Sequence, residues 1–162
     1  MAASTSPRVL RMAGSYYRKD GVSEEAFHAF CAGDHAIKAA KIHERYGILS
    51  YQVAFSTAST RAVTASLGLP WKIDDHDLII EYYFRSIADL LAISGDADFK
   101  ALHVDAMDFI TIDNTTVSLT WVETYLKDGR LTNVGEDGKS MYQSFAELSA
   151  LDMSDKFASK YY

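Results

Sequence analysis

Residues 77–84 read Asp-Leu-Ile-Ile-Glu-Tyr-Tyr-Phe, and this stretch decides the fold. Its near-continuous apolar character predicts a strand buried on both faces, because strands with one solvated face alternate apolar and polar residues. Glu81 is the exception, the one charged side chain inside the apolar run. Other parts of the protein, or a partner, must therefore pack against both faces of this strand.

The segments on either side of this strand alternate between strand and helix patterns. Apolar alternation bounded by turn residues predicts strands, and apolar residues spaced three and four apart behind a capping residue predict helices. The predicted strands cover residues 8–17, 47–56, 77–84 and 113–125, and the predicted helices cover 23–46, 59–67, 86–91, 98–110 and 144–151. The order β-α-β-(α)-β-α-β is that of a ferredoxin-like α+β fold, with helices on one face of a four-stranded sheet.

We expect this domain to span residues 8–126, followed by a more polar C-terminal extension, residues 127–162. Helices on one face leave the other face of the 77–84 strand bare, with Ile79 and Tyr83 on it. A second copy of the chain is the simplest cover, so we expect a homodimer. The extension has three interpretations: a pocket lid, a contact with the partner subunit, or a frayed end. Its final Tyr161-Tyr162 favours docking.

Composition excludes several classes of protein. The chain has 162 residues, of which 48% are hydrophobic and 23% charged, as in one ordinary globular domain. Sixteen basic and 22 acidic residues give a net charge of −6, which argues against nucleic acid and anionic lipid as partners. A single cysteine, Cys31, excludes internal disulfides and multi-cysteine metal sites. Without a leader pattern or a long apolar run, the sequence predicts a soluble cytoplasmic protein.

Several short motifs, in their order and spacing, resemble the EthD-like dimeric α+β barrel family, especially its members in fungal aromatic polyketide pathways. The motifs are Arg8-Val-Leu-Arg-Met-Ala-Gly-Ser-Tyr-Tyr-Arg-Lys19, Ser23-Glu-Glu-Ala-Phe-His28, His35, Tyr46-Gly47-Ile48, Tyr51, Asp77-Leu-Ile-Ile-Glu-Tyr82, the helix 99–109 with Asp105, and Asp113. The resemblance covers residues 8–125 and implies a dimeric α+β barrel. Such proteins include decarboxylases of anthraquinone-type carboxylic acids, and related barrels include cyclases and cofactor-free oxygenases.

One position departs from the family pattern. Family members usually follow the helix histidine with Gly-Pro or Ala-Pro, whereas His35 is followed here by Ala36-Ile37. Because proline breaks helices, its absence predicts that the helix 23–46 runs on without interruption.

His35 is the leading candidate for chemistry. Helical spacing aligns it with apolar residues that face the sheet, namely Phe27, Cys31, Ala39 and Ile42. An imidazole in that position has a pKa that its surroundings tune across neutrality, which suits proton transfer. The alternative is a core histidine held by a tyrosine hydroxyl or a backbone carbonyl.

The other histidines carry weaker arguments. His28 and His43 share roughly one side of the helix with His35, but spacings of seven and eight residues separate them by ~10–12 Å, too far for one metal ion. We therefore expect no metal site, and we expect His28 and His43 at a surface or an interface. His103 cannot face Asp105, two residues away on the same helix. It could meet His35 across a pocket, or be a solvated surface residue.

Glu81 and a set of aromatic residues complete the candidate site. A carboxylate in an apolar strand must be paired or have a raised pKa, so Glu81 either orients a histidine, acts as an acid or base, or pairs with Arg11. Tyr51 is the preferred pocket residue, because its strand lies opposite the His35 helix. The residues expected to line an aromatic pocket, for most of which packing is an equally good explanation, are Phe27, Tyr46, Tyr51, Tyr82, Tyr83 and Trp121.

With the resemblance, these residues predict a cofactor-independent enzyme of aromatic polyketide biosynthesis, first of all a decarboxylase. No motif requires a nicotinamide, a flavin or a metal, so no cofactor is expected. In this hypothesis a β-keto or ortho-hydroxy carboxylic acid binds in the apolar pocket, and His35 delivers a proton as CO2 leaves. An aldol-type cyclase, an isomerase or dehydratase, and a cofactor-free oxygenase remain alternatives. So do a non-catalytic carrier of a hydrophobic aromatic metabolite and an interaction domain whose pocket its own side chains fill.

Overall fold

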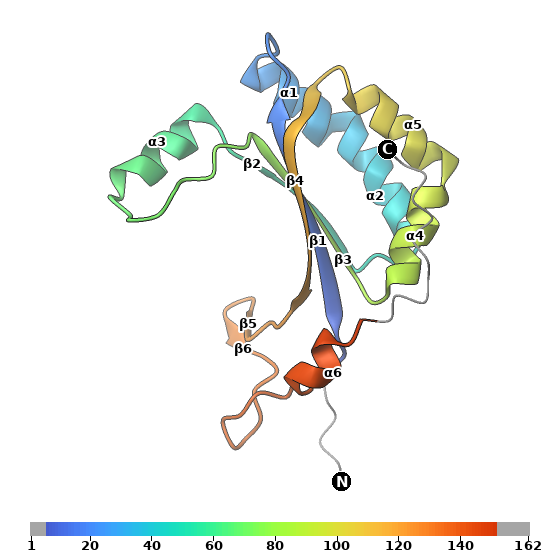
Figure 1. The fold of residues 1–162 in the computed structure, drawn as a ribbon, viewed down its shortest axis with the longest axis vertical. Coiled ribbons are helices and arrows are strands. Elements are labelled where there is room, and N and C mark those ends of the chain that lie inside the picture. Colours follow the sequence, from blue (N-terminus) through green and yellow to red (C-terminus); the bar gives the residue numbers. More distant parts are fainter. Residues whose placement is uncertain (1–5, 152–162) are drawn as a thin grey trace.

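Four antiparallel strands and the helices on one of their faces form the body of the molecule. The computed structural model describes residues 6–151. Strands β1 (Val9–Arg18), β2 (Ser50–Phe55), β3 (Leu78–Phe84) and β4 (Ile110–Val122) form one sheet in the order β2-β3-β1-β4. Helices α1 (Glu24–Phe30), α2 (Ala36–Arg45), α4 (Ile87–Gly95) and α5 (Ala97–Ala106) lie against the same face of this sheet (Figure 1). This is the predicted ferredoxin-like α+β fold, and the prediction is confirmed.

The core lies between the sheet and these helices. Successive side chains of a strand point to opposite faces, so Leu78, Ile80, Tyr82 and Phe84 of β3 face the helices. The most deeply buried large side chains are Phe84, Leu10, Ile93 and Leu148. Three apolar clusters follow one another along the sheet, and the cluster at its α1 end contains Phe27, Cys31 and Leu78.

The expected continuous helix over residues 23–46 is wrong. Helix α1 begins behind Ser23, whose side chain accepts a hydrogen bond from the Ala26 backbone N–H, and it ends at Phe30. A π-helical turn, η1 (Cys31–His35), follows, in which Gly33 has the non-helical angles φ −84° and ψ −128°, and α2 then begins. Glycine is the residue that most readily leaves helical geometry, so Gly33 breaks the helix without a proline.

The last helix and strand of the body meet earlier than expected. Helix α5 ends at Ala106 rather than at residue 110, and β4 already begins at Ile110 rather than at residue 113. The Phe109 N–H donates to the Ala106 carbonyl, a tight turn that ends the helix. Beyond it, β4 is irregular where it pairs with β1 between Ser15 and Tyr17, and Asn114 has a φ of +61°.

The far face of β3 is less apolar than its sequence predicts. Only Leu78 and Phe84 are fully buried, and the five residues between them are half-buried. The neighbours of Ile79, Glu81 and Tyr83 on that face are mainly polar or small, because β1, β2 and β4 contribute Arg11, Ala13, Ser15, Ser50, Gln52, Ala54, Thr116, Ser118 and Thr120. The apolar run therefore reflects one buried face and one mixed face.

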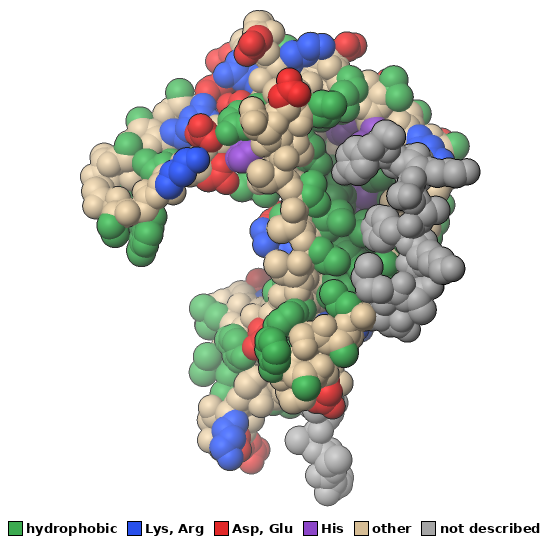
Figure 2. Space-filling view, in the orientation of Figure 1, with side chains coloured by type: hydrophobic (Ala, Val, Ile, Leu, Met, Phe, Trp, Pro, Cys, Tyr) green, Lys and Arg blue, Asp and Glu red, His purple; other side chains and the backbone are tan. Residues whose placement is uncertain are grey.

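Two projections flank this uncovered face. Helix α3 (Ala58–Ser66) stands away from the sheet at one end, and strands β5 (Leu126–Lys127) and β6 (Arg130–Leu131) form a small hairpin at the other (Figure 1). A hollow separates the two projections (Figure 2). Helix α6 (Phe145–Ser149) packs back on the body, where the Arg8 guanidinium donates to the carbonyls of Leu148, at 3.0 Å, and Ala150, at 2.7 Å.

The terminal pair Tyr161-Tyr162, for which docking was expected, lies outside the described residues. No described helix has the length and apolar character that crossing a bilayer requires.

Candidate active site

A small enclosed cavity lies between the sheet and the α1–η1 segment. It has a volume of about 30 Å³, room for one or two water molecules. All four strands of the sheet and three helical segments, α1, η1 and α5, contribute its walls: Tyr16, Phe30, Cys31, His35, Tyr51, Val53, Leu78, Ile80, Ala106 and Ile110. None of these side chains is a lysine, an arginine or a carboxylate, so the cavity is lined by neutral and apolar groups.

His35 lies at the end of η1, and its ring is 4.8 Å from the ring of Phe30. Phe30 in turn stacks on Phe109 at 3.9 Å, just before the start of β4. The buried Nδ1 atom of His35 has no hydrogen-bond partner among residues 6–151. Burial, and then the charge of His103, lower the pKa of His35 despite the opposing effect of Asp105. The imidazole is therefore neutral at pH 7, and it faces the sheet as its spacing predicts.

Tyrosines from adjacent strands supply the hydroxyl groups of this region. Tyr16 from β1 and Tyr51 from β2 line the cavity, and Tyr82 from β3 stacks on Tyr51 at 5.5 Å. Burial raises the pKa of Tyr51 to about 12, and burial also raises the pKa of Tyr82 well above its ordinary value. The phenols of Tyr51 and Tyr82 therefore stay protonated at neutral pH and can donate hydrogen bonds.

Cys31 also lines the cavity, one turn before His35. Burial raises the pKa of its thiol to about 12, so it does not form the thiolate that a nucleophilic cysteine needs. Cys31 is therefore a packing residue of the apolar cluster that also holds Phe27 and Leu78.

His43 is buried, and its prediction as a surface or interface residue is wrong. Its ring is only 2% exposed and lies between α2 and the sheet, 4.7 Å from the ring of Tyr51 and 4.8 Å from that of Tyr82. Neither ring nitrogen has a hydrogen-bond partner within the described part of the chain. Burial, with a smaller effect of the His103 charge, lowers the pKa of His43 to about 4. Helical spacing alone could not predict the burial of His43, because the groups that cover this face of α2 belong to β2, β3 and α5.

His103 lies on α5, exposed, outside the cavity lining. Its Nδ1 is 3.0 Å from the Phe99 carbonyl, and its ring packs on Phe99 at 4.5 Å. Its charge lowers the pKa of both His35 and His43, so it is near both, although it contacts neither of their rings in the described structure. His103 is therefore a surface residue, as the second of its two interpretations holds, and its charge affects the pKa values of His35 and His43.

Glu81 points to the opposite face of the sheet from His35. Its Oε1 accepts a hydrogen bond of 2.7 Å from Nε of Arg11, and the two side chains form an ion pair. The Tyr83 hydroxyl donates to its other oxygen at 3.4 Å. Of the interpretations open for Glu81, pairing with Arg11 is the one that the structure shows, and a role beside His35 is excluded by strand alternation.

The other expected pocket residues lie outside the cavity lining. Phe27 is buried in the cluster that contains Cys31 and Leu78, and so supports the wall from behind. The Tyr46 hydroxyl donates to Asp96 at 2.8 Å, at the start of α5. Trp121 packs near the other end of the sheet, 5.9 Å from Phe145.

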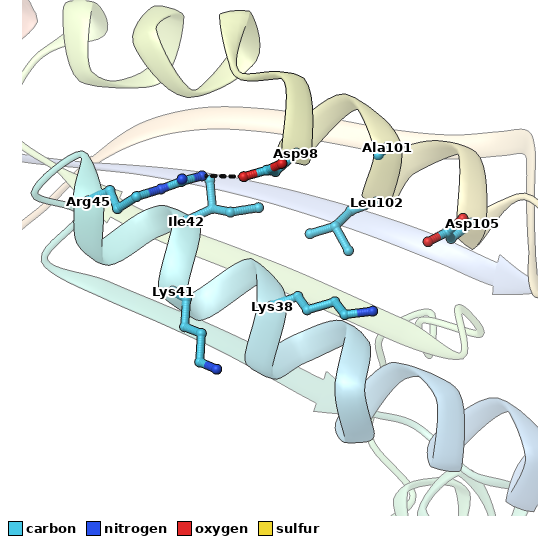
Figure 3. Close-up of a pocket in the computed structure, with 8 residues that line it drawn as sticks. All are labelled: Lys38, Lys41, Ile42, Arg45, Asp98, Ala101, Leu102 and Asp105. Atoms are coloured by element: carbon cyan, nitrogen blue, oxygen red, sulfur yellow. Dashed lines mark hydrogen bonds and ion pairs between the residues drawn. The ribbon is translucent and has the colours of Figure 1, made fainter.

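The α2–α5 groove is larger but differs in character. Its volume is about 450 Å³, and it is lined by Lys38, Lys41, Ile42, Arg45, Asp98, Ala101, Leu102 and Asp105 (Figure 3). Arg45 bridges it with an ion pair of 3.0 Å to Asp98. Opposite charges thus face each other across an open groove, which suits contact between two helices better than binding of an apolar ligand.

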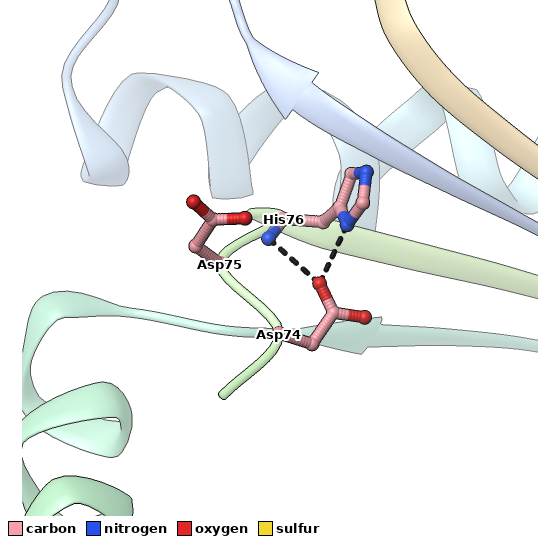
Figure 4. Close-up of side chains that lie close together, drawn as sticks. All are labelled: Asp74, Asp75 and His76. Carbon is pink, nitrogen blue, oxygen red and sulfur yellow. Dashed lines mark hydrogen bonds and ion pairs between the residues drawn. The ribbon is translucent and has the colours of Figure 1, made fainter. Parts of the chain in front are cut away.

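The only cluster of potential metal ligands within residues 6–151 comprises Asp74, Asp75 and His76 (Figure 4). Both ring nitrogens of His76 already face acceptors, Nδ1 at 2.5 Å from Asp74 and Nε2 at 3.2 Å from the Asn114 carbonyl. Although burial opposes its charge, the hydrogen bonds to Asp74 and Asn114 raise the pKa of His76. The His76 ring thus connects the loop that precedes β3 to Asn114 of β4, and both of its nitrogens are engaged, so neither is available to a metal.

Comparison with known proteins places these residues in a family context. The sequence profile of the EthD domain matches residues 19–113. A protein of Aspergillus terreus named "Putative oxygenase" is 35% identical over 145 residues, which cover 87% of this chain and 91% of that protein. Decarboxylase nsrE of Aspergillus novofumigatus is 28% identical over 80% of this chain and 95% of its own length. The conidial pigment biosynthesis dehydratase EthD of Metarhizium robertsii is 27% identical over 71% and 83%.

Among solved structures, an EthD family protein from Bacillus halodurans aligns with 70% of this chain and 96% of its own, at 21% identity and a TM-score of 0.47. The fungal relatives are thus named for decarboxylation, dehydration and oxygenation.

Proposed function

This chain belongs to the EthD domain family, and from that premise we propose that it is a cofactor-independent decarboxylase of an aromatic or β-keto carboxylic acid in fungal polyketide metabolism. The observation that carries the proposal is the half-buried imidazole of His35, with a lowered pKa and a buried Nδ1, in a cavity lined by no lysine, arginine or carboxylate. Decarboxylation needs little more than that, because one proton moves and CO2 leaves without a second reactant.

The uncharged lining favours the loss of CO2 in two ways. A carboxylic acid enters such a cavity in its neutral form, because no cation there compensates a carboxylate. Once His35 has taken the carboxyl proton, the carboxylate is held against apolar walls and paired only with the new imidazolium. Loss of CO2 removes this poorly solvated charge, and the environment therefore assists the step.

The proton balance closes within the site. The neutral imidazole accepts the carboxyl proton; the bond between the carboxylate carbon and the adjacent carbon then breaks. Its electron pair moves into the conjugated carbonyl or phenol system, and CO2 departs. The imidazolium returns the proton to the carbon that lost CO2, which regenerates neutral His35. A buried hydroxyl such as that of Tyr51 donates to the substrate oxygen while that oxygen carries negative charge.

A polycyclic substrate requires this cavity to enlarge, since 30 Å³ holds only water. The movable wall is α1, a seven-residue helix that η1 separates from α2 at Gly33. Displacement of Phe30 and Phe27 with α1 opens the site toward solvent without disturbing the sheet.

The test is turnover of carboxylated anthrones and naphthols by the purified protein without added metal or cofactor, with products read by mass spectrometry. His35→Ala should lower the rate of CO2 loss by about 10²-fold or more, as expected for removal of a general acid–base group. His28→Ala, which changes an exposed histidine of α1, is the matched control and should keep activity. Loss of less than tenfold in His35→Ala would contradict the assignment.

An oxygenase is the second candidate, because the relative that is 35% identical over most of the chain carries that name. The two reactions separate by product mass, loss of CO2 against gain of oxygen. A loss of water would favour dehydration. Tight binding without any turnover would favour a carrier of an aromatic metabolite.

We also propose that two copies of the chain associate through the uncovered sheet face. Large apolar side chains are exposed on the two projections that flank the hollow, among them Trp71 beyond α3, 71% exposed, and Leu131 in the hairpin, 77% exposed. A second copy in the hollow, related by a twofold axis, places each of these surfaces against the other chain.

A further inference from the structure

Tyr16 lies in the cavity wall with its ring laid back along its own strand. A Cβ atom built on Gly14 would lie 2.6 Å from the Tyr16 hydroxyl oxygen and 2.9 Å from Cζ. These distances are shorter than van der Waals contacts allow. The Tyr16 ring therefore occupies the space that any other residue at position 14 would fill with its side chain.

Gly14 has no other evident reason to be glycine. It lies inside β1, the strand that pairs on both sides, opposite Ile80 of β3 and Val117 of β4. Its φ is not positive, so the backbone does not demand glycine there. A glycine inside a paired strand usually marks a close approach by another group, and here that group is the Tyr16 phenol.

The hydroxyl of Tyr16 is thereby directed toward the other two tyrosines. Tyr51 and Tyr82 face each other across β2 and β3, and Tyr82 pairs with Met12 of β1. By leaning from position 16 back over Gly14, the Tyr16 ring shifts its hydroxyl along β1 in the direction of that pair. The electrostatic influence of Tyr16 on both other phenols, whose pKa values it raises, agrees with this proximity.

We propose that Tyr16 is a further catalytic residue. Because Gly14 has no side chain, the Tyr16 ring can lie over it, and in this position the Tyr16 hydroxyl donates a hydrogen bond to the substrate oxygen that becomes negative. The proposal rests on the proposed decarboxylation. When the carbon–carbon bond breaks, the electron pair moves to the conjugated oxygen, and Tyr16 stabilises that charge until His35 returns its proton to carbon. A phenol suits this role, because its O–H group can donate a hydrogen bond into the cavity that Tyr16 lines.

Two substitutions separate the chemistry of Tyr16 from its position. Tyr16→Phe removes the hydroxyl but keeps the ring, and it should lower kcat by about 10²-fold with little change in KM. Gly14→Ala keeps the hydroxyl but displaces it. Because the displaced atoms, Oη, Cζ and Cε2, lie at the far end of a side chain, Gly14→Ala should fold while losing a similar part of kcat.

The double variant decides between this role and general packing. If Gly14→Ala acts through Tyr16, adding it to Tyr16→Phe should lower kcat less than threefold further, whereas independent effects multiply. Tyr17→Phe is the matched control, because Tyr17 is adjacent but its hydroxyl donates to Asp75, away from the cavity, and it should keep full activity. Multiplying effects, or a Tyr16→Phe variant with more than half of wild-type kcat, would overturn the proposal.

A binding measurement tests Tyr16 even if the chain does not decarboxylate. A fluorescent naphthol, whose neutral and anionic forms emit differently, serves as a probe of a developing phenolate. The wild type should bind the naphtholate at least about tenfold more tightly than Tyr16→Phe does, with little difference for the neutral naphthol. Equal binding of the anion by both proteins, or binding by neither, would overturn the role of Tyr16. Absence of CO2 loss from the wild type would instead refute the proposed reaction.

Discussion

His43 is an imidazole held in an aromatic environment with no hydrogen-bond partner in the described part of the chain. A buried neutral group of this kind costs free energy of folding, and protonating it costs more. The pKa of His43 is about 4 in the folded protein, below the ordinary value of 6.5. The unfolded chain therefore binds a proton more readily than the folded chain between these pH values, and acid favours unfolding.

This yields a prediction for stability. As the pH falls from 6.5 to 4, the free energy of unfolding should decrease by about 3 kcal/mol because of His43. Above pH 7 His43 is neutral in both states and should not affect the pH dependence. His43→Leu should abolish this part of the pH dependence and leave stability at pH 7.5 unchanged or raised, since no hydrogen bond is lost.

Urea unfolding at pH 7.5, 5.5 and 4.5 measures both effects. His28→Leu is the control, because His28 is exposed on α1, and it should keep the slope of the wild type. An unchanged slope in His43→Leu would show that other groups cause the acid sensitivity.

The surroundings of a residue could be predicted from sequence only where they depend on the periodicity of the residue's own helix or strand. Helical spacing alone was enough to turn His35 toward the sheet, because the same stripe holds Phe27 and Cys31. Tyr16 was missed although a signal existed, since Gly14 interrupts a strand pattern two residues earlier. Burial of His43 depends on where α5 docks, which is a tertiary property that no local pattern contains.

At the scale of elements, the break between α1 and α2 is the hinge about which we propose that α1 moves to admit substrate. Gly33 takes angles outside the helical region, and a Cβ atom built there would meet nothing within 4 Å. Gly33→Ala should therefore fold, while restricting the backbone change that lets α1 swing. We expect kcat/KM for a polycyclic substrate to fall by about tenfold, because entry becomes slower.

Steady-state kinetics with substrates of different size check this prediction. Gly95→Ala is the matched control. Gly95 also has open space around it and no positive φ, but it lies in α4, away from α1. Equal kcat/KM values for the wild type and Gly33→Ala would mean that the cavity opens by another route.

The order of the elements could be predicted from sequence more reliably than their ends. Strand alternation and capping residues such as Ser23 and Ser86 define elements locally, and the ferredoxin-like arrangement follows from their order. The break at Gly33 goes against the prediction, because the absence of a proline after His35 favours a continuous helix and the effect of Gly33 depends on packing. The mixed far face of β3 was not predicted either, because it depends on which residues of β1, β2 and β4 lie beside Glu81.

For the whole molecule, the uncovered sheet face leads to a prediction about assembly. Light scattering should give a mass twice the 18.0 kDa of one chain. Trp71→Asp combined with Leu131→Asp should weaken the dimer, because both side chains are exposed on the projections and would be buried between copies. Val104→Asp is the control, since Val104 is 72% exposed on α5, on the other side of the sheet.

The thermal midpoint of a dimer rises with protein concentration, so a second measurement is available. Wild-type protein should show this rise, and the double variant should show less of it. A mass of 18.0 kDa at all concentrations would mean that the hollow between α3 and the hairpin has another occupant or none.

The alternation along β3 has a consequence for how such a protein can diverge. Tyr82 belongs to the tyrosine group near His35, whereas its neighbours Glu81 and Tyr83 lie on the far face, engaged with Arg11. Adjacent codons thus contribute to opposite sides of one sheet. Mutations on one side can accumulate under selection for chemistry, and mutations on the other under selection for assembly, with little interference between them. With the pairing of two copies that we propose, a lineage built on this sheet can acquire a new reaction while it keeps its quaternary contacts, or change those contacts while it keeps its reaction.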